Sequence, residues 1–262
     1  MPSARVIVCL DVRAGRTVKG TRFEGLVDIG DPVAMAADYE RDGADEVVFL
    51  DIAASSEGRS TVLDTATRTA ATVFIPLVIG GGIRTVDDAR AALNAGADKV
   101  CLTSPAVARP ALITEVAERF GAQCAVANVD AARTDAGGWE VRTHMATGRT
   151  GLDAIAWATE CVERGAGELL VTSVDRDGTR SGYDLELLAA VRDAVDVPVI
   201  ASGGAGTTDH VVEAFRAGAD AALLAGALHD GTLSVADVKA ALSAAGFEVR
   251  DTQPARAVTE RT

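Results

Sequence analysis

The sequence contains few aromatic residues or histidines and has no long hydrophobic run. Only 4% of its 262 residues are aromatic, and three are histidine. The longest stretch without charge, residues 69–83, is shorter than the roughly 18 to 20 residues that a membrane span needs, and Pro76 and a run of glycines interrupt it. Residues 1–10 also lack the charged-then-apolar pattern of a secretory signal. We therefore expect no membrane partner.

Basic clusters are absent as well, which disfavours a nucleic-acid partner. The chain carries 25 Lys and Arg against 38 Asp and Glu, a formal net charge of −13. Proteins that bind a phosphate backbone need a basic patch, whereas no run of Lys or Arg here exceeds two residues. The surplus of carboxylates predicts a soluble chain with a hydrated, acidic surface.

Metal and disulfide chemistry have little support. The four cysteines are far apart and form no Cys-x-x-Cys pair, and their mostly apolar neighbours favour buried free thiols in a reduced, cytoplasmic protein. The histidines are too scattered for a metal triad, so we expect no metal and no other cofactor. The residues are Cys9, Cys101, Cys124 and Cys161, and His144, His210 and His229.

What is present is a strict alternation of short Val-, Ile- and Leu-rich runs with alanine-rich helical segments. The runs are nearly continuous in apolar residues, which is typical of parallel strands buried on both faces. Eight such units in about 250 residues predict a (β/α)8 TIM barrel, with an open, doubly wound sheet as the alternative. The expected strands are Val6–Asp11, Glu46–Asp51, Pro76–Gly80, Lys99–Leu102, Cys124–Asp130, Glu168–Ser173, Pro198–Ser202 and Ala221–Ala225. The expected helices cover residues 32–42, 61–72, 85–95, 110–120, 151–164, 185–194, 208–217 and 235–245.

An internal repeat favours the barrel. A shift of 122 residues places Pro76–Ser104 on Pro198–Gly226 without a gap, with several glycines and the word Gly-Ala-Asp in common. Two half-barrels of four strand–helix units account for this repeat, whereas an open sheet does not. We predict one α/β domain over residues 1–250, a single TIM barrel made of two similar half-barrels.

Two long loops and a polar tail interrupt the pattern. Residues 12–30 are expected to form a loop after the first strand, and residues 131–150 contain a predicted hairpin around Trp139–Thr143. Loops that follow barrel strands lie on the face that carries active sites, and they often act as lids. We expect residues 251–262 to be a disordered C-terminal tail.

The first and fifth predicted strands each end in an aspartate, Asp11 and Asp130. These positions are equivalent in the two half-barrels, so the two carboxylates should face each other across the barrel mouth. Opposed carboxylates with apolar strands behind them suit a general acid and a general base that act on a small substrate. The alternative is that each aspartate only caps the following loop.

Glycine-rich turns follow the third and seventh strands, at Gly80–Gly82 and Ser202–Gly206. Backbone N–H groups in such turns, together with a helix N-terminus, bind anions. Two symmetric turns predict a substrate with a phosphate at each end, and tight turns without a ligand are the alternative. The expected phosphate contacts, which include the ends of the fourth and eighth strands, are Gly81, Gly82, Thr103, Ser104, Gly203, Gly204, Ala225 and Gly226.

Further substrate contacts are expected from two loops. Lys19 in the first loop either closes over one phosphate or is an ordinary surface lysine. The loop after the sixth strand offers Asp177 and Gly178, and Ser173 lies at the end of that strand.

Four charged residues start strands at the opposite, N-terminal end of the barrel: Arg5, Glu46, Lys99 and Glu168. They are expected to form a charged ring across the barrel bottom. Such a ring is either a salt-bridged plug or a gate over a passage through the barrel.

With these residues in place, the chain resembles the cyclase subunits of imidazole glycerol phosphate synthase, a family of histidine biosynthesis. The resemblance extends from residue 5 to about residue 250. The matching words are Cys9-Leu10-Asp11-Val12, Val18-Lys19-Gly20, Gly30-Asp31-Pro32, Phe49-Leu50-Asp51-Ile52, Gly80-Gly81-Gly82-Ile83, Gly96-Ala97-Asp98-Lys99-Val100, Asp175-Arg176-Asp177-Gly178-Thr179, Gly182-Tyr183-Asp184 and Ala201-Ser202-Gly203-Gly204-Ala205-Gly206.

The resemblance implies a function. Ammonia from a glutaminase partner would enter at the barrel bottom, pass the ring of four charged residues and reach a bisphosphorylated ribulosyl formimino intermediate. The products would be imidazole glycerol phosphate and aminoimidazole carboxamide ribotide. Asp11 and Asp130 would be the acid–base pair, and Asp98 is the candidate docking contact for the partner.

Some positions depart from the family's usual sequence. Thr103 stands in place of Asn and Gly226 in place of Ser, Met145–Thr147 replaces Gly-Gly-Arg, and Leu228 and Asp230 replace aromatic residues. A lost donor at a phosphate site weakens binding by about 1 kcal/mol. Two alternatives stay open: the aminoaldose–aminoketose isomerase of the same pathway, and a divergent, non-catalytic barrel that binds a bisphosphate.

Overall fold

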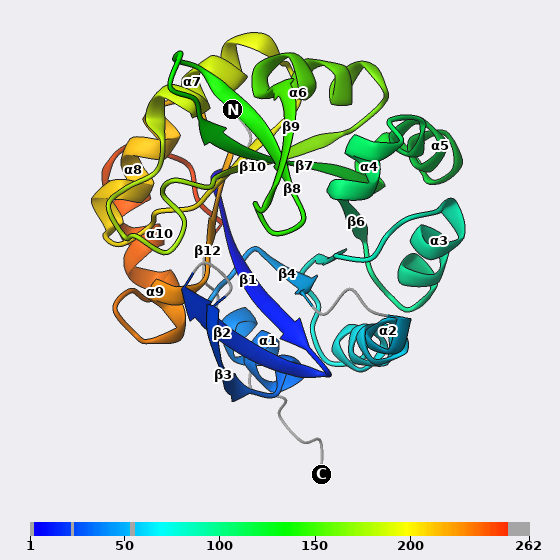
Figure 1. Cartoon of the computed structure of the whole chain (residues 1–262). Helices are drawn as coiled ribbons and strands as arrows, with labels where there is room; N and C mark the ends of the chain where they lie inside the picture. The colour runs from blue at the N-terminus through cyan, green and yellow to red at the C-terminus, as the bar shows by residue number, and fades with distance from the viewer. Residues whose placement is uncertain (1–2, 22–23, 53–55, 251–262) are drawn as a thin grey trace.

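The computed structural model describes residues 3–21, 24–52 and 56–250. Within them, eight parallel strands close into a barrel (Figure 1), which confirms the predicted (β/α)8 TIM barrel. Around the barrel the strands are β1 (Arg5–Arg13), β4 (Glu46–Asp51), β5 (Leu77–Gly80), β6 (Lys99–Leu102), β7 (Ala125–Arg133), β10 (Glu168–Ser173), β11 (Val199–Ser202) and β12 (Ala221–Leu224), which pairs with β1.

Helices surround the barrel (Figure 1). They are α1 (Pro32–Arg41), α2 (Ser56–Ala70), α3 (Val86–Asn94), α4 (Ser104–Ala108), α5 (Ala111–Phe120), η1 (Ala122–Cys124), α6 (Ala154–Glu163), α7 (Leu185–Ala194), α8 (Thr208–Arg216), α9 (Gly226–His229) and α10 (Val235–Ala244). The short helices α4 and α9 were not predicted, because four or five residues are too few for a helical period to show.

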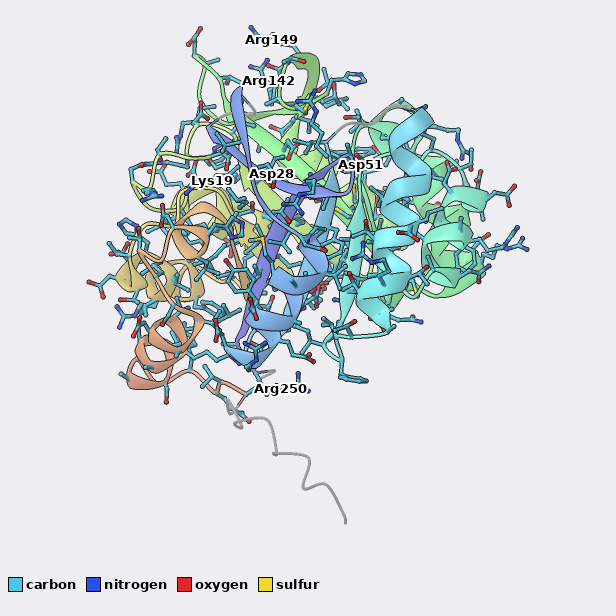
Figure 2. All side chains as sticks on the ribbon, turned by 90° about the horizontal axis from the view of Figure 1, so that it is seen from below. Lys19, Asp28, Asp51, Arg142, Arg149 and Arg250 are labelled. Carbon is cyan, nitrogen blue, oxygen red and sulfur yellow. The ribbon has the colours of Figure 1, made fainter. Side chains whose placement is uncertain are left out.

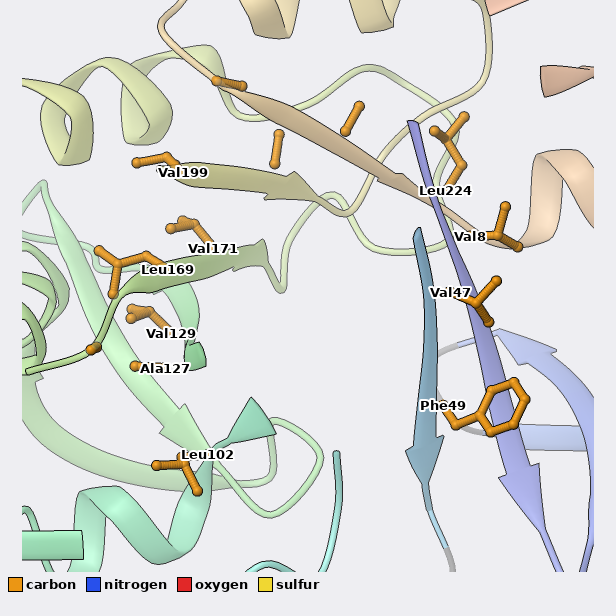
Figure 3. Packing of buried hydrophobic residues seen from close by; sticks show 14 of the residues in the cluster. Val8, Val47, Phe49, Leu102, Ala127, Val129, Leu169, Val171, Val199 and Leu224 are labelled. Carbon is orange, nitrogen blue, oxygen red and sulfur yellow. The ribbon is translucent and has the colours of Figure 1, made fainter. Parts of the chain in front are cut away.

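Side chains on the barrel strands alternate between two apolar cores, which explains their continuous apolar sequences. On β1, Val6, Val8 and Leu10 face the helices, whereas Ile7 and Cys9 face the barrel interior. Figure 3 shows the outer layer, with residues such as Val8, Phe49 and Val171 projecting from β1, β4 and β10. Because side chains alternate between the two faces of a strand, every second residue points into the barrel interior. This alternation determines which side chains at the strand ends reach the site.

Two antiparallel extensions rise from equivalent barrel strands. β2 (Arg16–Thr21) and β3 (Glu24–Gly30) continue from β1, so the expectation of an irregular loop over residues 12–30 was wrong. Polar and apolar residues do not alternate regularly in that segment, so the sequence gives little sign of strands. Pairing with the long β1 makes it adopt strand structure. β8 (Trp139–Thr143) and β9 (Gly148–Asp153) extend β7 and confirm the predicted hairpin. The predicted tail, residues 251–262, lies outside the described residues.

The repeated Gly-Ala-Asp words have a structural role at the barrel bottom. In each, the aspartate carboxylate accepts a hydrogen bond from an N–H group at the start of the neighbouring strand. The pairs are Asp45 with Val6 N at 2.8 Å, Asp98 with Leu77 N at 2.8 Å, and Asp220 with Val199 N at 2.9 Å.

In the described part of the chain, no helix is long and apolar enough to cross a bilayer.

Candidate active site

Asp11 and Asp130 occupy inward positions at the upper ends of β1 and β7. Ile7 and Cys9 precede Asp11 on the inward face, and Val126 precedes Asn128 and Asp130 in the same way. The alternation therefore directs both carboxylates into the barrel mouth, above an apolar interior. Among the described residues neither carboxylate forms a salt bridge.

The low polarity beneath the mouth changes the acidity of both groups. Burial, together with the negative charge of Asp177, raises the pKa of Asp11 to about 7. Burial also raises the pKa of Asp130 to about 6, with Asp177 acting in the same direction. Asp177, from the loop after β10, is thus electrostatically coupled to both carboxylates. Two carboxyl groups that titrate near neutrality can exchange protons with a substrate.

Two residues that sequence analysis missed hold Asp130 in place. Asn128 Nδ2 donates to Asp130 Oδ1 at 3.0 Å, and Thr172 Oγ1 donates to Asn128 Oδ1 at 3.4 Å. Both hydrogen bonds lie on the inward face, because Thr172 is the register partner of Asp130. The signal was present: Asn128 is a polar residue two positions before Asp130 in an otherwise apolar strand. The same alternation turns Ser173 outward, with Ala131 as its register partner.

The glycine turn after β11 has a backbone that requires glycine. Gly203 and Gly204 have φ of +88° and +107°, and a Cβ on Gly204 would lie 2.2 Å from the carbonyl oxygen of Gly182. The loop after β10, which includes Gly178, therefore packs directly against this turn. Lys19 Nζ reaches across from β2 and donates to Gly226 O at 3.2 Å. The structure thus brings Lys19 to Gly226, and the loop after β10 to Gly203 and Gly204.

The turn after β5 is its counterpart in the other half. Gly81 and Gly82 also have positive φ, +85° and +69°, and a Cβ on Gly81 would lie 2.3 Å from Asp51 O. Thr103 and Ala225, which precede α4 and α9, share an unusual backbone, with φ/ψ of −119°/−118° and −133°/−93°. Ser104 Oγ accepts a hydrogen bond from His144 N at 2.9 Å, which links this half-site to the β8–β9 hairpin.

The four predicted ring residues meet at the barrel bottom. Lys99 Nζ lies 2.9 Å from Glu46 Oε2 and 2.8 Å from Glu168 Oε2. Arg5 pairs with the same two carboxylates, at 3.3 Å from Glu46. Burial raises the pKa of Glu46, while Lys99 and Arg5 oppose the shift. Each of the two cations thus pairs with both carboxylates, so the four side chains form a closed ring in which positive and negative charges alternate.

No group of His, Cys, Asp and Glu residues suited to a metal ion occurs within the described ranges. Cys9 and Cys101 lie in the barrel interior, where burial raises the pKa of both thiols. Neither thiol is therefore poised as a nucleophile.

Comparisons with known proteins agree with this geometry. The family model described as "Histidine biosynthesis protein" matches residues 5–234. The chain belongs to this family. It is 60% identical to the imidazole glycerol phosphate synthase subunit HisF of Myxococcus xanthus, and the match covers 95% of this chain and 99% of that protein. Proteins of the same name from Streptomyces avermitilis and Mycobacteroides abscessus are 56% and 54% identical, over 95% of this chain and 99% of each.

Three residues singled out in the sequence, Thr103, Gly226 and Asp230, lie at the short helices α4 and α9. Thr103 precedes α4 and matches Ala225 in the 122-residue repeat, whereas Gly226, the first residue of α9, matches Ser104. Asp230, which caps the C-terminus of α9, forms a salt bridge with Lys19 at 3.0 Å. Arg180 pairs with the same carboxylate. Sequence analysis assigned no role to Arg180, and a basic residue in a polar loop carries no signal of its own.

Proposed function

We propose that this chain is the cyclase of imidazole glycerol phosphate synthase and acts in histidine biosynthesis. The observation that carries the proposal is the pair of inward carboxylates, Asp11 and Asp130, with pKa values raised to about 7 and about 6. They lie on opposite halves of a barrel mouth flanked by two equivalent glycine turns. This arrangement fits a substrate with a phosphate at each end and reactive atoms in the middle.

The two carboxyl groups share the roles of base and acid. One accepts the proton that the ammonia nitrogen loses as it adds to the substrate, and the other protonates the leaving nitrogen as the intermediate is cleaved. Condensation of ammonia with the substrate ketone releases the carbonyl oxygen as water, and ring closure with cleavage of the other carbon–nitrogen bond then yields imidazole glycerol phosphate and aminoimidazole carboxamide ribotide. Asn128 and Thr172 keep Asp130 oriented.

The phosphates are bound mostly by the main chain. Gly81, Gly82, Thr103 and Ser104 hold one phosphate, and Gly203, Gly204, Ala225 and Gly226 hold the other, with Lys19 over the second. Asp177 and Gly178 contact the substrate between them, and Ser173 supports that loop, since its carbonyl accepts from Asp177 N at 3.0 Å. Main-chain donors are needed because the net charge of −13 opposes a dianionic ligand.

The barrel bottom serves a glutaminase subunit. The ring of Arg5, Glu46, Lys99 and Glu168 gates the entry of ammonia, and its loss of one cation would open a path along the barrel axis. Asp98 is the docking contact. Its counterparts Asp45 and Asp220 pair with Lys239 at 2.7 Å and Arg192 at 3.0 Å, whereas Asp98 forms no ion pair with any described residue. The proposal places both subunits in the cytoplasm, in keeping with four free cysteines.

The direct test is turnover of the bisphosphate intermediate with ammonium salts, followed by detection of imidazole glycerol phosphate. The expected result is ammonia-dependent product formation without a partner. Binding of the intermediate without product would overturn the proposal in favour of a non-catalytic barrel. Conversion of the aminoaldose substrate of the pathway's isomerase, without ammonia, would overturn it in favour of that enzyme.

A further inference from the structure

Asp230 lies at a meeting point of two loops above the half-site of β11 and β12. Its Oδ2 accepts from Lys19 Nζ at 3.0 Å and also from the Arg180 guanidinium. Its Oδ1 accepts from Thr232 Oγ1 at 2.6 Å and from Thr232 N at 3.1 Å. These contacts hold the pKa of Asp230 below its usual range. One carboxylate thus neutralises two cations at this half-site.

Both cations are placed to contact an anion in the same half-site. Lys19 touches Gly226, the first residue of α9, through Nζ. Arg180 lies in the same loop as Asp177, between β10 and α7, and its carbonyl oxygen would lie 2.4 Å from a Cβ on Gly206, in the turn after β11. Arg180 also has a φ of +57°, which is unfavourable for a residue with a side chain. Its backbone therefore packs tightly against the turn that is proposed to bind phosphate.

The other half-site has no such arrangement among the described residues. There the hydroxyl of Ser104 accepts from His144 N, and no carboxylate joins two cations above Gly81 and Gly82. The two glycine turns are alike in backbone, so the difference lies in side chains that only one half supplies. Phosphate bound beside Gly226 would have two cations within reach, provided that Asp230 released them.

We propose that Arg180 is a second side-chain ligand, with Lys19, for the substrate phosphate at the β11–β12 half-site, and that Asp230 is an internal counter-ion that this phosphate displaces. The ligand is a phosphate monoester dianion. Asp230 keeps the two cations at the site while it is empty, and it lowers the affinity for phosphate because it competes for them. The inference rests on the proposed function, since it deepens one of the two phosphate half-sites.

The test is calorimetric titration of the full-length chain with sn-glycerol 3-phosphate, fitted to two sites. Replacing Arg180 by Gln should weaken one site about tenfold, because a charge-assisted hydrogen bond is lost. Replacing Asp230 by Asn should tighten the same site about three- to tenfold. The double variant should bind more tightly than R180Q, but gain less than D230N gains over the unmodified chain, because only Lys19 is then left for Asp230 to compete for. The other site should not change.

Controls come from an exposed ion pair on α6, Glu160 with Arg164 at 2.7 Å. The variants E160Q and R164Q remove the same charges far from the glycine turns in sequence and should leave both affinities unchanged. R180K keeps the charge and should lose no more than about threefold, which guards against a folding defect in R180Q. In turnover, R180Q should raise KM for the bisphosphate with little change in kcat.

Two results would overturn the inference: unchanged phosphate affinity in R180Q, or weaker binding in D230N, which would make Asp230 an organiser of the site and not a competitor. Failure of the proposed function is distinguishable from either. If the unmodified chain binds glycerol phosphate with the expected pattern of variants but forms no imidazole product, the cyclase assignment fails and the phosphate site stands.

Discussion

The two ends of the barrel interior use buried carboxylates in opposite ways. At the bottom, Glu46 and Glu168 share Lys99 and Arg5, so each negative charge has two positive neighbours. At the top, Asp11 and Asp130 have no cation partner among the described residues, and the nearby charge is a third carboxylate, Asp177. Figure 2 shows the molecule from the side, with Lys19 and Asp51 toward one end and Arg250 at the other.

This difference separates a structural end from a reactive end within one fold. Both sets of carboxylates occupy inward positions of the same strand alternation. At the bottom, Lys99 and Arg5 oppose the rise that burial causes in the pKa of Glu46, and the four side chains form a closed ring of salt bridges. Unpaired burial at the top disfavours ionisation, and the carboxyl groups titrate near neutral pH. Pairing therefore decides which end can exchange protons with a substrate.

The largest effect is expected at the reactive end. Replacing Asp11 or Asp130 by Asn removes the proton-transfer group and should lower ammonia-dependent kcat by about 10²- to 10⁴-fold. The measurement is steady-state turnover of the bisphosphate intermediate. Because the Asn side chain has nearly the same shape as the Asp side chain it replaces, the KM for the bisphosphate intermediate should change little.

The same variants should be more stable than the unmodified chain at pH 8. A folded-state pKa of about 7 lies above the ordinary value of 3.8 for an aspartate, so folding is penalised wherever the free carboxyl would be ionised. Asn removes this penalty, and the melting temperature of D11N should rise at pH 8 but not at pH 3. A loss of stability at pH 8 would show that the top carboxylates are structural, like those at the bottom.

The next effect is on stability at the structural end. Replacing Lys99 by Met leaves Glu46 and Glu168 to share Arg5, and the free energy of unfolding should fall by about 3 kcal/mol. Both carboxylates are well buried, with side chains 2% and 6% exposed, so water cannot replace the lost partner. Chemical denaturation at pH 7.5 measures the change.

A compensating variant distinguishes charge from packing. Adding E46Q to K99M removes one surplus carboxylate and should recover most of the lost stability. If the double variant is as unstable as K99M, the lysine stem and not its charge holds the ring. K99M should also uncouple glutamine hydrolysis from cyclisation. Its turnover with ammonium salts should be unchanged, whereas in the glutamine-driven reaction part of the ammonia should escape to solvent before it reacts.

A smaller effect is expected for the glutaminase contact. Replacing Asp98 by Asn keeps an oxygen for the hydrogen bond from Leu77 N, now 2.8 Å long, and removes only the charge. Association with the glutaminase should weaken about tenfold, which calorimetry or surface binding would measure, with kcat on ammonia unchanged. Equal affinity of D98N and the unmodified chain would exclude Asp98 as a docking charge.

The fold was largely predictable because the barrel strands are continuous apolar runs that can be recognised in the sequence. Glu46–Asp51, Lys99–Leu102 and Glu168–Ser173 were placed with their observed bounds, since continuous apolar runs and the 122-residue repeat reinforce each other. The strands β2 and β3 were missed, because pairing to the extended β1 and not local alternation determines them. Long-range pairing of this kind leaves no periodic mark in the sequence.

The site was predictable wherever the repeat or strand ends marked it. Asp11 and Asp130 follow from their places at equivalent strand ends, and the glycine turns follow from the repeat. Thr172, Arg180 and Asp230 were not predicted, because each acts through a partner at least 44 residues away in sequence. The pattern of one chain cannot supply such contacts without the closed barrel.

The smallest effect is a shift in pH dependence caused by Asp177. The base must be ionised and the acid protonated, so kcat/KM should be a narrow bell whose limbs reflect the coupled pair at about 6 and about 7. Asp177 raises both pKa values through its negative charge, and D177N should therefore move both limbs to lower pH, by less than one unit. The measurement keeps free NH3 constant at each pH. The control is D175N, which removes a charge from the same loop while an oxygen still accepts from Arg133 N, now at 2.7 Å. Limbs that stay in place in D177N, or that move equally in D175N, would show that burial alone sets the acidity at the reactive end.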